Sequence, residues 1–202
     1  MHAQTLEFWF EFASSYSYLS VMRVEALARD AGVTLQWRPF LLGPVFLSLG
    51  WNDSPFNIYP PKGRYMWRDL ARLSTRYGLP LQIPSRFPRN GLLAARVALA
   101  GADEGWIGDF SRGVMTANFA EDREISDPAV IRGILENLQL DADTILARAH
   151  SPEIKEALRR QTDRAGEIGL FGAPSFVTPD GELFWGNDRL EDALAWVAAR
   201  PA

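Results

Sequence analysis

Apolar and polar residues alternate along residues 6–12, near the start of the chain. The apolar side chains share one face of this stretch: Leu6, Phe8, Phe10 and Phe12. A period of two predicts a β-strand. Apolar residues then recur at helical spacing over residues 16–31, and Gly32 can end this helix in a left-handed conformation. Residues 33–38 predict a second strand, stopped by Pro39, so the chain opens with a βαβ unit whose strands lie parallel.

The middle of the chain changes to helical spacing. Residues 39–61 are rich in Pro, Gly, Asn and Ser and predict a long irregular connection, and long loops in compact domains usually serve a function. Residues 62–169 predict a series of helices, at residues 64–77, 91–102, 106–119, 127–138, 142–149 and 152–168. Two of these helices are expected to begin with a capping residue followed by proline, at Asp127 and at Ser151.

Strand patterns return near the C-terminus. Residues 175–178 and 182–185 are separated by a Pro-Asp-Gly turn and predict a β-hairpin. A last helix is expected over residues 188–199.

The order of these elements predicts the fold class and the domains. The order βαβ, helices, ββα is typical of an α/β fold with a large all-helical insertion between its two halves. We expect residues 1–61 and 170–202 to form one domain, and residues 62–169 to form the helical insertion. A chain of 202 residues suits one domain that carries such an insertion.

The composition excludes several classes of function. The formal net charge of -4 argues against nucleic acid as a partner, because phosphate binding needs a basic surface. The chain has no cysteine, which excludes disulfides, dithiol redox chemistry and thiolate metal sites. The two histidines, His2 and His150, leave little for a transition-metal site, so we expect no metal.

The N-terminal residues do not have the pattern of a signal peptide. Residues 1–5 lack a charged segment followed by a long apolar one, and no run approaches the ~20 apolar residues that span a bilayer. We therefore expect a cytoplasmic protein with no membrane partner.

Three serines lie where the first strand ends and the first helix begins: Ser14, Ser15 and Ser17. Helix capping explains an isolated serine in this position in most cases. The same place also has free backbone N–H groups and the positive end of a helix dipole, which stabilise an anion. A serine hydroxyl can donate to that anion as well. A Ser-His-Asp hydrolase is poorly supported, because no histidine is near in sequence and no Gly-x-Ser-x-Gly motif is present.

Two segments near the C-terminus could face a ligand. Residues 166–175 are glycine-rich, but they follow a helix and precede a strand, which is the wrong context for a nucleotide-binding loop. A cis peptide at Ala173-Pro174 would expose the preceding backbone to a ligand, whereas the local sequence alone favours the trans form. Asn187 or Asp188 can cap the last helix. Alternatively, the N–H groups there bind a ligand carboxylate while Asp188 binds an ammonium group.

Charged side chains form two further patterns. Arginines recur every four residues along one predicted helix: Arg64, Arg68, Arg72 and Arg76. A solvated helix face is the favoured explanation, although Lys62 and Arg64 could border a cleft. Glu7 and Glu11 share one face of the first strand, where a glycosidase-like carboxylate pair is one interpretation. A solvent-facing edge or a single buried and paired acid is favoured.

Four segments, considered together, match a known family in order and spacing over essentially the whole chain. They are residues 10–18 (FEFASSYSY), 62–66 (KGRYM), 172–175 (GAPS) and 185–189 (WGNDR). This combination resembles the 2-hydroxychromene-2-carboxylate isomerase family, a relative of the kappa-class glutathione transferases and of the DsbA-type oxidoreductases. The resemblance implies a thioredoxin-like fold that carries a helical insertion, which agrees with the order of elements above.

The resemblance also implies a glutathione site built from residues far apart in the sequence. Ser14 would hold the glutathione sulfur and favour its thiolate form. Pro174 would follow a cis peptide bond, and Ala173 before it would pair with the glutathione backbone. Asn187 and Asp188 would hold the γ-glutamyl end.

Further positions follow from the same resemblance. Ser15 stands where the family commonly has proline, which leaves a less rigid helix start or a role shared by two hydroxyls as alternatives. Of two loop asparagines near a glutathione-contacting position, Asn52 is preferred to Asn57. Lys62 is expected at the cofactor site, and Lys62 or Arg64 would bind the carboxylate of the substrate.

The function implied by the resemblance is glutathione-dependent cis-trans isomerisation. The reaction would interconvert 2-hydroxychromene-2-carboxylate and trans-o-hydroxybenzylidenepyruvate, or a close aromatic analogue, by reversible thiolate addition. A kappa-like glutathione transferase or peroxidase is the first alternative, and a non-catalytic thioredoxin-fold binding module is the second. We expect glutathione as cofactor, a small aromatic substrate and a homodimer.

Overall fold

The structure is a computed structural model that describes residues 4–199. It begins with β1 (Thr5–Phe10), α1 (Ser15–Val21), α2 (Val24–Asp30) and β2 (Thr34–Pro39). The helices that follow are α3 (Leu42–Ser48), α4 (Pro55–Ile58), α5 (Pro60–Tyr77), α6 (Leu92–Ala100), α7 (Ile107–Phe119), α8 (Pro128–Asn137), α9 (Ala142–Ala149) and α10 (Pro152–Glu167). The last elements are β3 (Ser175–Val177), β4 (Leu183–Trp185), the 3-10 turn η1 (Asn187–Arg189) and α11 (Leu190–Ala198). This order confirms the predicted α/β fold with a helical insertion, and the exact domain boundaries stay a prediction.

The four strands form one mixed sheet in the order β2-β1-β3-β4. β1 pairs with β2 in parallel and with β3 antiparallel, and β3 and β4 form an antiparallel hairpin. The parallel βαβ opening and the C-terminal hairpin were both predicted and are confirmed. Because β1 lies inside the sheet and both of its faces are covered, Phe8, Trp9 and Phe10 are all fully buried.

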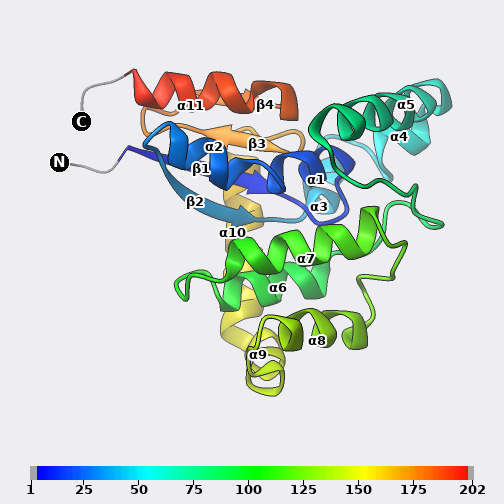
Figure 1. The fold of residues 1–202 in the computed structure, drawn as a ribbon, viewed down its shortest axis with the longest axis vertical. Helices are drawn as coiled ribbons and strands as arrows, with labels where there is room; N and C mark the ends of the chain where they lie inside the picture. Colours follow the sequence, from blue (N-terminus) through cyan, green and yellow to red (C-terminus); the bar gives the residue numbers. More distant parts are fainter. Residues whose placement is uncertain (1–3, 200–202) are drawn as a thin grey trace.

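Helices cover both faces of the sheet, with α10 passing behind it in Figure 1. On one face, Phe8 and Phe10 of β1 belong to the larger hydrophobic core, together with residues of α1, α7 and α11. On the other face, Trp9 packs with Phe40 after β2 and with Ala165 of α10. Adjacent residues of one strand therefore stabilise two separate cores.

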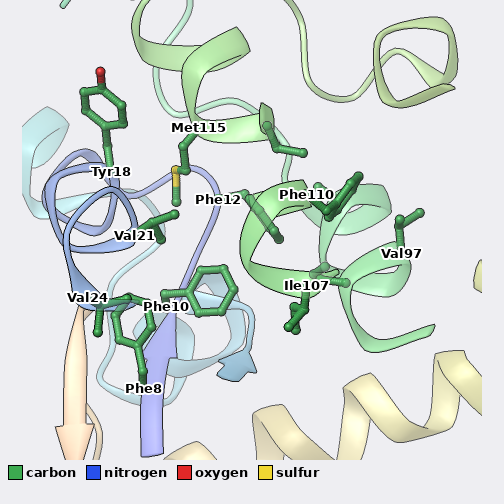
Figure 2. Packing of buried hydrophobic residues seen from close by; sticks show 14 of the residues in the cluster. Phe8, Phe10, Phe12, Tyr18, Val21, Val24, Val97, Ile107, Phe110 and Met115 are labelled. Atoms are coloured by element: carbon green, nitrogen blue, oxygen red, sulfur yellow. The ribbon is translucent and has the colours of Figure 1, made fainter. Parts of the chain in front are cut away.

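The inserted helices share the larger core with the sheet. Figure 2 shows Phe12, just after β1, near Phe110 of α7, and the centroids of these two rings lie 6.2 Å apart. Val97 of α6 and Met115 of α7 belong to the same cluster. Each large apolar side chain buried in this way contributes about 1.5–3 kcal/mol to stability. The end of β1 is therefore held in place by helices of the insertion.

The segment of residues 39–61 is not the long irregular connection that we predicted, because it contains α3 and α4. Two of its prolines lie in the first turns of these helices, with Pro44 as the third residue of α3 and Pro55 as the first residue of α4. The N–H groups of a first turn have no partner within the helix, so proline costs little there. Composition alone does not separate such a segment from a loop, because proline is common in both.

The single helix predicted over residues 16–31 is in fact two helices, α1 and α2, which break at Met22 and Arg23. The break has no proline or glycine to explain it. At the break, the Arg23 side chain donates to Asn187 Oδ1 at 3.3 Å and pairs with Glu191. The same guanidinium group lies 3.8 Å from the centroid of the Tyr77 ring. These tertiary contacts outweigh the local preference for one continuous helix.

Several local predictions about helix ends are confirmed. Asp127 Oδ1 accepts a hydrogen bond from the backbone of α8 at 2.8 Å, and Ser151 Oγ accepts one from the backbone of α10 at 3.3 Å. Each of these caps is followed by proline. Gly32 has a φ angle of +69°, so it adopts the left-handed conformation expected after α2.

Asn187 joins three parts of the fold through a buried side chain that is 2% exposed. Its Oδ1 accepts hydrogen bonds from Ser20 Oγ of α1 at 3.1 Å and from Arg23 at 3.3 Å. Its Nδ2 donates to the Tyr77 hydroxyl at the end of α5, at 3.5 Å. The start of α11 is thereby connected to α1 and α5, which carry other parts of the site.

The Asn187→Ala variant is expected to lose about 1–3 kcal/mol of the free energy of unfolding, because buried polar groups such as the Ser20 hydroxyl would lose their partner. Denaturant unfolding followed by circular dichroism measures this loss. The matched control is Asn52→Ala, since Asn52 is exposed and makes no side-chain hydrogen bond within residues 4–199. The control should change the free energy by less than about 0.5 kcal/mol, and equal effects of the two variants would contradict the prediction.

Candidate functional site

The serine turn, residues 11–17, connects β1 to α1. Ser14 caps α1 as predicted, because its Oγ accepts a hydrogen bond from the Ser17 N–H at 3.2 Å. The N–H groups of Ser15 and Tyr16, in the first turn of α1, have no hydrogen-bond partner among the described residues. The serine turn therefore offers a hydroxyl and free backbone donors to an anion.

The Ser14 hydroxyl also reaches the loop before β3. Ser14 Oγ donates to the Ala173 carbonyl at 2.9 Å, although the two residues are 159 positions apart in the sequence. The Ala173-Pro174 peptide bond is cis, so the trans form favoured by local sequence is wrong and the form implied by the family resemblance is confirmed. The Ala173 N–H has no partner within residues 4–199. Ser14 and the loop at Pro174 are therefore direct neighbours.

The start of α11 is attached to the same loop. The Gly186 N–H donates to the Pro174 carbonyl at 2.9 Å, and η1 follows directly. In the described part of the chain, the N–H groups of Asn187 and Asp188 make no hydrogen bond. The Asp188 side chain is 75% exposed. This helix start can bind a carboxylate through its N–H groups and an ammonium group through Asp188.

Tyr16, a residue of the serine turn, contacts α5 and lies near Asp188. Its hydroxyl donates to Asp69 Oδ2 of α5 at 3.0 Å, and its ring centroid lies 6.2 Å from that of Phe56 in α4. Burial is the largest cause that raises the pKa of the Tyr16 phenol, and Asp69, Tyr65 and Asp188 raise this pKa further. Asp188 is therefore near enough to Tyr16 to act on it electrostatically. The serine turn lies among α4, α5 and the start of α11.

Two predicted positions have side chains that are already bonded. The Asn187 side chain belongs to the buried network described above, which leaves its backbone N–H as the group available to a ligand. Ser15 is also buried, and its hydroxyl donates to Met66 Sδ of α5 at 2.9 Å. The residue in the usual position of proline thus attaches the serine turn to α5. The Ser15 hydroxyl thus contacts α5, whereas the Ser14 hydroxyl contacts the loop at Ala173.

The other predicted cofactor residues lie on the surface near α4 and α5. Asn57 Nδ2 donates to Asp53 Oδ1 and Oδ2 at 3.2 Å and to the Phe87 carbonyl at 3.3 Å. Asn52 and Lys62 are exposed, and neither side chain has a polar partner among residues 4–199. Their side chains are therefore free for a ligand, although no contact in the structure joins them to the serine turn.

The two glutamates that the sequence placed on one strand face have different surroundings, with Glu7 in β1 and Glu11 just after it. Glu7 Oε1 accepts hydrogen bonds from Arg38 at 2.8 Å and from Arg164 at 3.0 Å. Glu11 has no cationic partner within the described residues, and its Oε1 accepts the Ala13 N–H at 3.3 Å. Burial raises the pKa of Glu11 from 4.5 to about 7, and the bond from Ala13 opposes this shift. Glu7 is paired and half-buried, which is closer to the paired acid than to the solvent-facing edge among the two favoured alternatives, because β1 is not an edge strand.

The unusual state of Glu11 was not predicted. The available signal in the sequence was a carboxylate at the end of a buried strand with only apolar residues and serines as neighbours. That pattern does not reveal whether a distant arginine approaches, as Arg38 and Arg164 approach Glu7.

A buried arginine supports the serine turn from the side of α7. Arg89 is 5% exposed and donates to Asn118 Oδ1 at 3.1 Å, and it also pairs with Asp122. Asn118 Nδ2 in turn donates to the Phe12 carbonyl at 3.0 Å. The backbone directly before Ser14 is therefore fixed to α7.

The remaining charged residues and histidines do not extend the site. The arginines of α5 are exposed, as expected for a solvated face: Arg64, Arg68, Arg72 and Arg76. His150 Nδ1 lies 2.7 Å from the Leu146 carbonyl at the end of α9, and His2 lies outside the described residues. Across residues 4–199, no three His, Asp or Glu side chains gather in a way that could hold a metal ion. None of the helices in that range combines the length and apolar character needed to cross a membrane.

Comparisons with known proteins cover nearly the whole chain. Residues 5–195 match the DsbA-like thioredoxin domain family. A 2-hydroxychromene-2-carboxylate isomerase of Sphingobium xenophagum is 31% identical over 193 residues, which are 93% of this chain and 95% of that protein. A glutathione S-transferase kappa 2 of Caenorhabditis elegans is 26% identical and covers 96% of this chain and 92% of its own length.

The solved structure of a 2-hydroxychromene-2-carboxylate isomerase superposes on this fold with a TM-score of 0.83 and 28% sequence identity. The superposition covers 96% of this chain and 95% of the other chain. The expected thioredoxin-like fold is therefore confirmed. The chain belongs to the DsbA-like thioredoxin domain family and, within it, to the family of the 2-hydroxychromene-2-carboxylate isomerases.

Proposed function

We propose that this chain is a glutathione-dependent isomerase that interconverts 2-hydroxychromene-2-carboxylate and trans-o-hydroxybenzylidenepyruvate, or a close aromatic analogue. The observation that carries this proposal is the 2.9 Å hydrogen bond from the Ser14 hydroxyl to the Ala173 carbonyl. It brings together two of the turns that the family resemblance assigns to glutathione. The names of the similar proteins support the same reaction class.

The backbone groups around Ser14 fit an extended peptide ligand such as glutathione. The N–H of Ala173, beside the cis bond to Pro174, is unbonded within residues 4–199 and can pair with a peptide carbonyl. A γ-glutamyl end carries one carboxylate and one ammonium group. The N–H groups of Asn187 and Asp188 suit the carboxylate, and the exposed carboxylate of Asp188 suits the ammonium group. Asn187 would contribute through its backbone.

We assign Ser14 to the sulfur of the cofactor. Bound glutathione would supply a thiolate that adds reversibly to the conjugated double bond of the substrate. The N–H groups of Ser15 and Tyr16 are free donors in this turn, and the Ser14 hydroxyl would turn its one proton from the Ala173 carbonyl to the sulfur. Donors of this kind lower the pKa of a thiol from its usual value of about 8.5, and each unit is worth about 1.36 kcal/mol.

The exposed polar side chains near α4 and α5 would complete the site. We propose Asn52 and Lys62 as further cofactor contacts, because both side chains are exposed and unbonded in the described part of the chain. Lys62 or Arg64 would bind the carboxylate of the aromatic substrate. We further propose a homodimer in the cytoplasm.

A kappa-like glutathione transferase or peroxidase is the second candidate, favoured by the similarity to glutathione S-transferase kappa 2. One assay separates the candidates. The purified protein is mixed with 2-hydroxychromene-2-carboxylate, with and without glutathione, and the absorbance of the open-chain product is followed. Equilibration that needs glutathione but does not consume it supports the isomerase, and net consumption without isomerisation supports the transferase. If calorimetry detects no glutathione binding at millimolar concentration, a non-catalytic binding module replaces both.

The Ser14→Ala variant is expected to lower kcat for isomerisation about 10²–10³-fold, because it removes a hydrogen-bond donor from an ionised sulfur. Steady-state kinetics at saturating glutathione measure this effect, and circular dichroism checks the fold. The matched control is Ser15→Ala, whose hydroxyl faces Met66 and which should retain most of the activity. Turnover of Ser14→Ala near that of the wild type would show that Ser14 is not the group that binds the sulfur.

The Asp188→Asn variant is expected to weaken glutathione binding about tenfold, or about 1.4 kcal/mol, because the ammonium group would lose its charged partner. Titration calorimetry measures the Kd for glutathione. Asp103→Asn is the control, since Asp103 is exposed and forms no ion pair within residues 4–199. A similar Kd in the two variants would exclude Asp188 from the cofactor site.

A further inference from the structure

Glu11 places a carboxyl group at the base of the serine turn. Its Oε1 accepts the Ala13 N–H at 3.3 Å, and its backbone carbonyl accepts the Ser14 N–H at 3.0 Å. Its own backbone N–H donates to Ser17 Oγ at 3.5 Å. The carboxyl group is therefore bonded to the same short turn that carries the Ser14 hydroxyl.

The residues packed against this carboxyl group bring no charge to it. A Cβ atom on Gly91 would lie 2.9 Å from Glu11 Oε1 and 3.1 Å from Phe12 Cβ, so a glycine here leaves room for the carboxyl group. The nearest charged residue in the loop before α6, Arg89, donates to Asn118 instead. The serine turn itself contributes Phe12, Ala13, three serines and Tyr16, whose hydroxyl donates to Asp69. The carboxyl group is thus partly removed from water and has no cation to balance it.

Burying an ionised carboxylate without a cation costs free energy of folding, so such a group tends to be protonated or to serve a function. Burial raises the pKa of Glu11 to about 7, so both protonation states are populated near neutral pH. A group with such a pKa is an effective proton carrier, because it can both accept and release a proton at the working pH. Glu7 lies in β1 and is instead neutralised by Arg38 and Arg164.

We infer that the Glu11 carboxyl group carries the proton in the ring-opening and ring-closing step of the reaction. This inference rests on the proposed function. In 2-hydroxychromene-2-carboxylate, one carbon atom bears both a hydroxyl group and the ring oxygen. Ionised Glu11 accepts the hydroxyl proton, the hydroxyl oxygen forms the ketone, and the bond to the ring oxygen breaks with its electron pair on that oxygen. Glu11 then returns the proton to the phenolate and is ionised again, so protons and charge balance.

A purely structural role for Glu11 makes a different prediction. As a cap, its Oε1 would only accept the Ala13 N–H. A glutamine side chain has nearly the same shape and can accept the same hydrogen bond, but it cannot carry a proton. The Glu11→Gln variant should therefore fold and separate the two roles.

Glu11→Gln is expected to bind glutathione with the Kd of the wild type and to show the same ultraviolet absorbance of the bound thiolate. Its kcat for ring opening should fall about 10²–10⁴-fold. In the wild type, kcat should rise with pH up to about 7, where Glu11 becomes ionised, and this rise should be absent from the variant. Glu11→Asp keeps a carboxyl group, so its kcat should be at least about tenfold higher than that of Glu11→Gln.

A direct titration tests Glu11 without substrate or glutathione. Infrared difference spectroscopy should show the C=O band of a protonated carboxyl group that disappears as the pH rises through about 7. The band should be missing from Glu11→Gln. It should persist in the control Glu167→Gln, because Glu167 is exposed and unpaired within residues 4–199.

Each outcome supports or overturns the inference. If the wild type isomerises the substrate and Glu11→Gln retains kcat within about threefold, Glu11 carries no proton in the reaction. If the infrared band titrates near 4.5, the ordinary value for this group, the inference is also overturned. If the wild type binds glutathione but shows no isomerisation, the proposed function fails, and the inference fails with it.

Discussion

The hydrogen bond from the Ser14 hydroxyl to the Ala173 carbonyl joins two turns that are 159 residues apart, and the candidate site depends on this contact. It is possible because β1 and β3 are antiparallel neighbours, so the end of β1 lies beside the start of β3. The hairpin then brings the end of β4 to the same edge, where the Gly186 N–H donates to the Pro174 carbonyl. Strand pairing therefore brings the serine turn, the cis-proline loop and the start of α11 to one edge, where the Ser14 and Asn187 side chains join them.

The serine turn also needs rigid support, because displacement of a binding group by about 1 Å can cost much of its effect. β1 supplies this support from inside the sheet, where aromatic side chains fill both of its faces. Arg89 adds to it through Asn118, which donates to the Phe12 carbonyl within the serine turn. Buried and fully bonded polar groups of this kind hold a backbone in one position. The helical insertion thus supports the site although the proposed ligand contacts lie mainly outside it.

Side chains in the site divide between those that complete the fold and those that stay available. Asn187 and Ser15 were both candidates for ligand contact, yet their side chains have buried partners inside the protein. Asp188 and Glu11 retain carboxyl groups that can act on a ligand, with Asp188 also 3.7 Å from the exposed Arg189 side chain. The Ser14 hydroxyl becomes available when it leaves the Ala173 carbonyl. A polar side chain that is already bonded must break a favourable contact before it can bind anything else. Burial, and not residue type, separates the two groups, because Ser15 and Asn187 are buried whereas Ser14 is half-buried and Asp188 is exposed.

Local patterns in the sequence were sufficient to determine the strands, the hairpin, the coarse order of βαβ, helices and ββα, and the helix caps at Asp127 and Ser151, because each depends on residues a few positions apart. The sequence motifs indicated the family and the choice of Ser14 as the candidate site residue. Tertiary structure alone decided the break at Arg23, the helices within residues 39–61 and the buried role of Asn187. It also decided that Glu7 has arginine partners whereas Glu11 has none among residues 4–199. The physical reason is that burial and charge pairing depend on residues far away in the sequence, which are brought near only when the sheet and the helices pack.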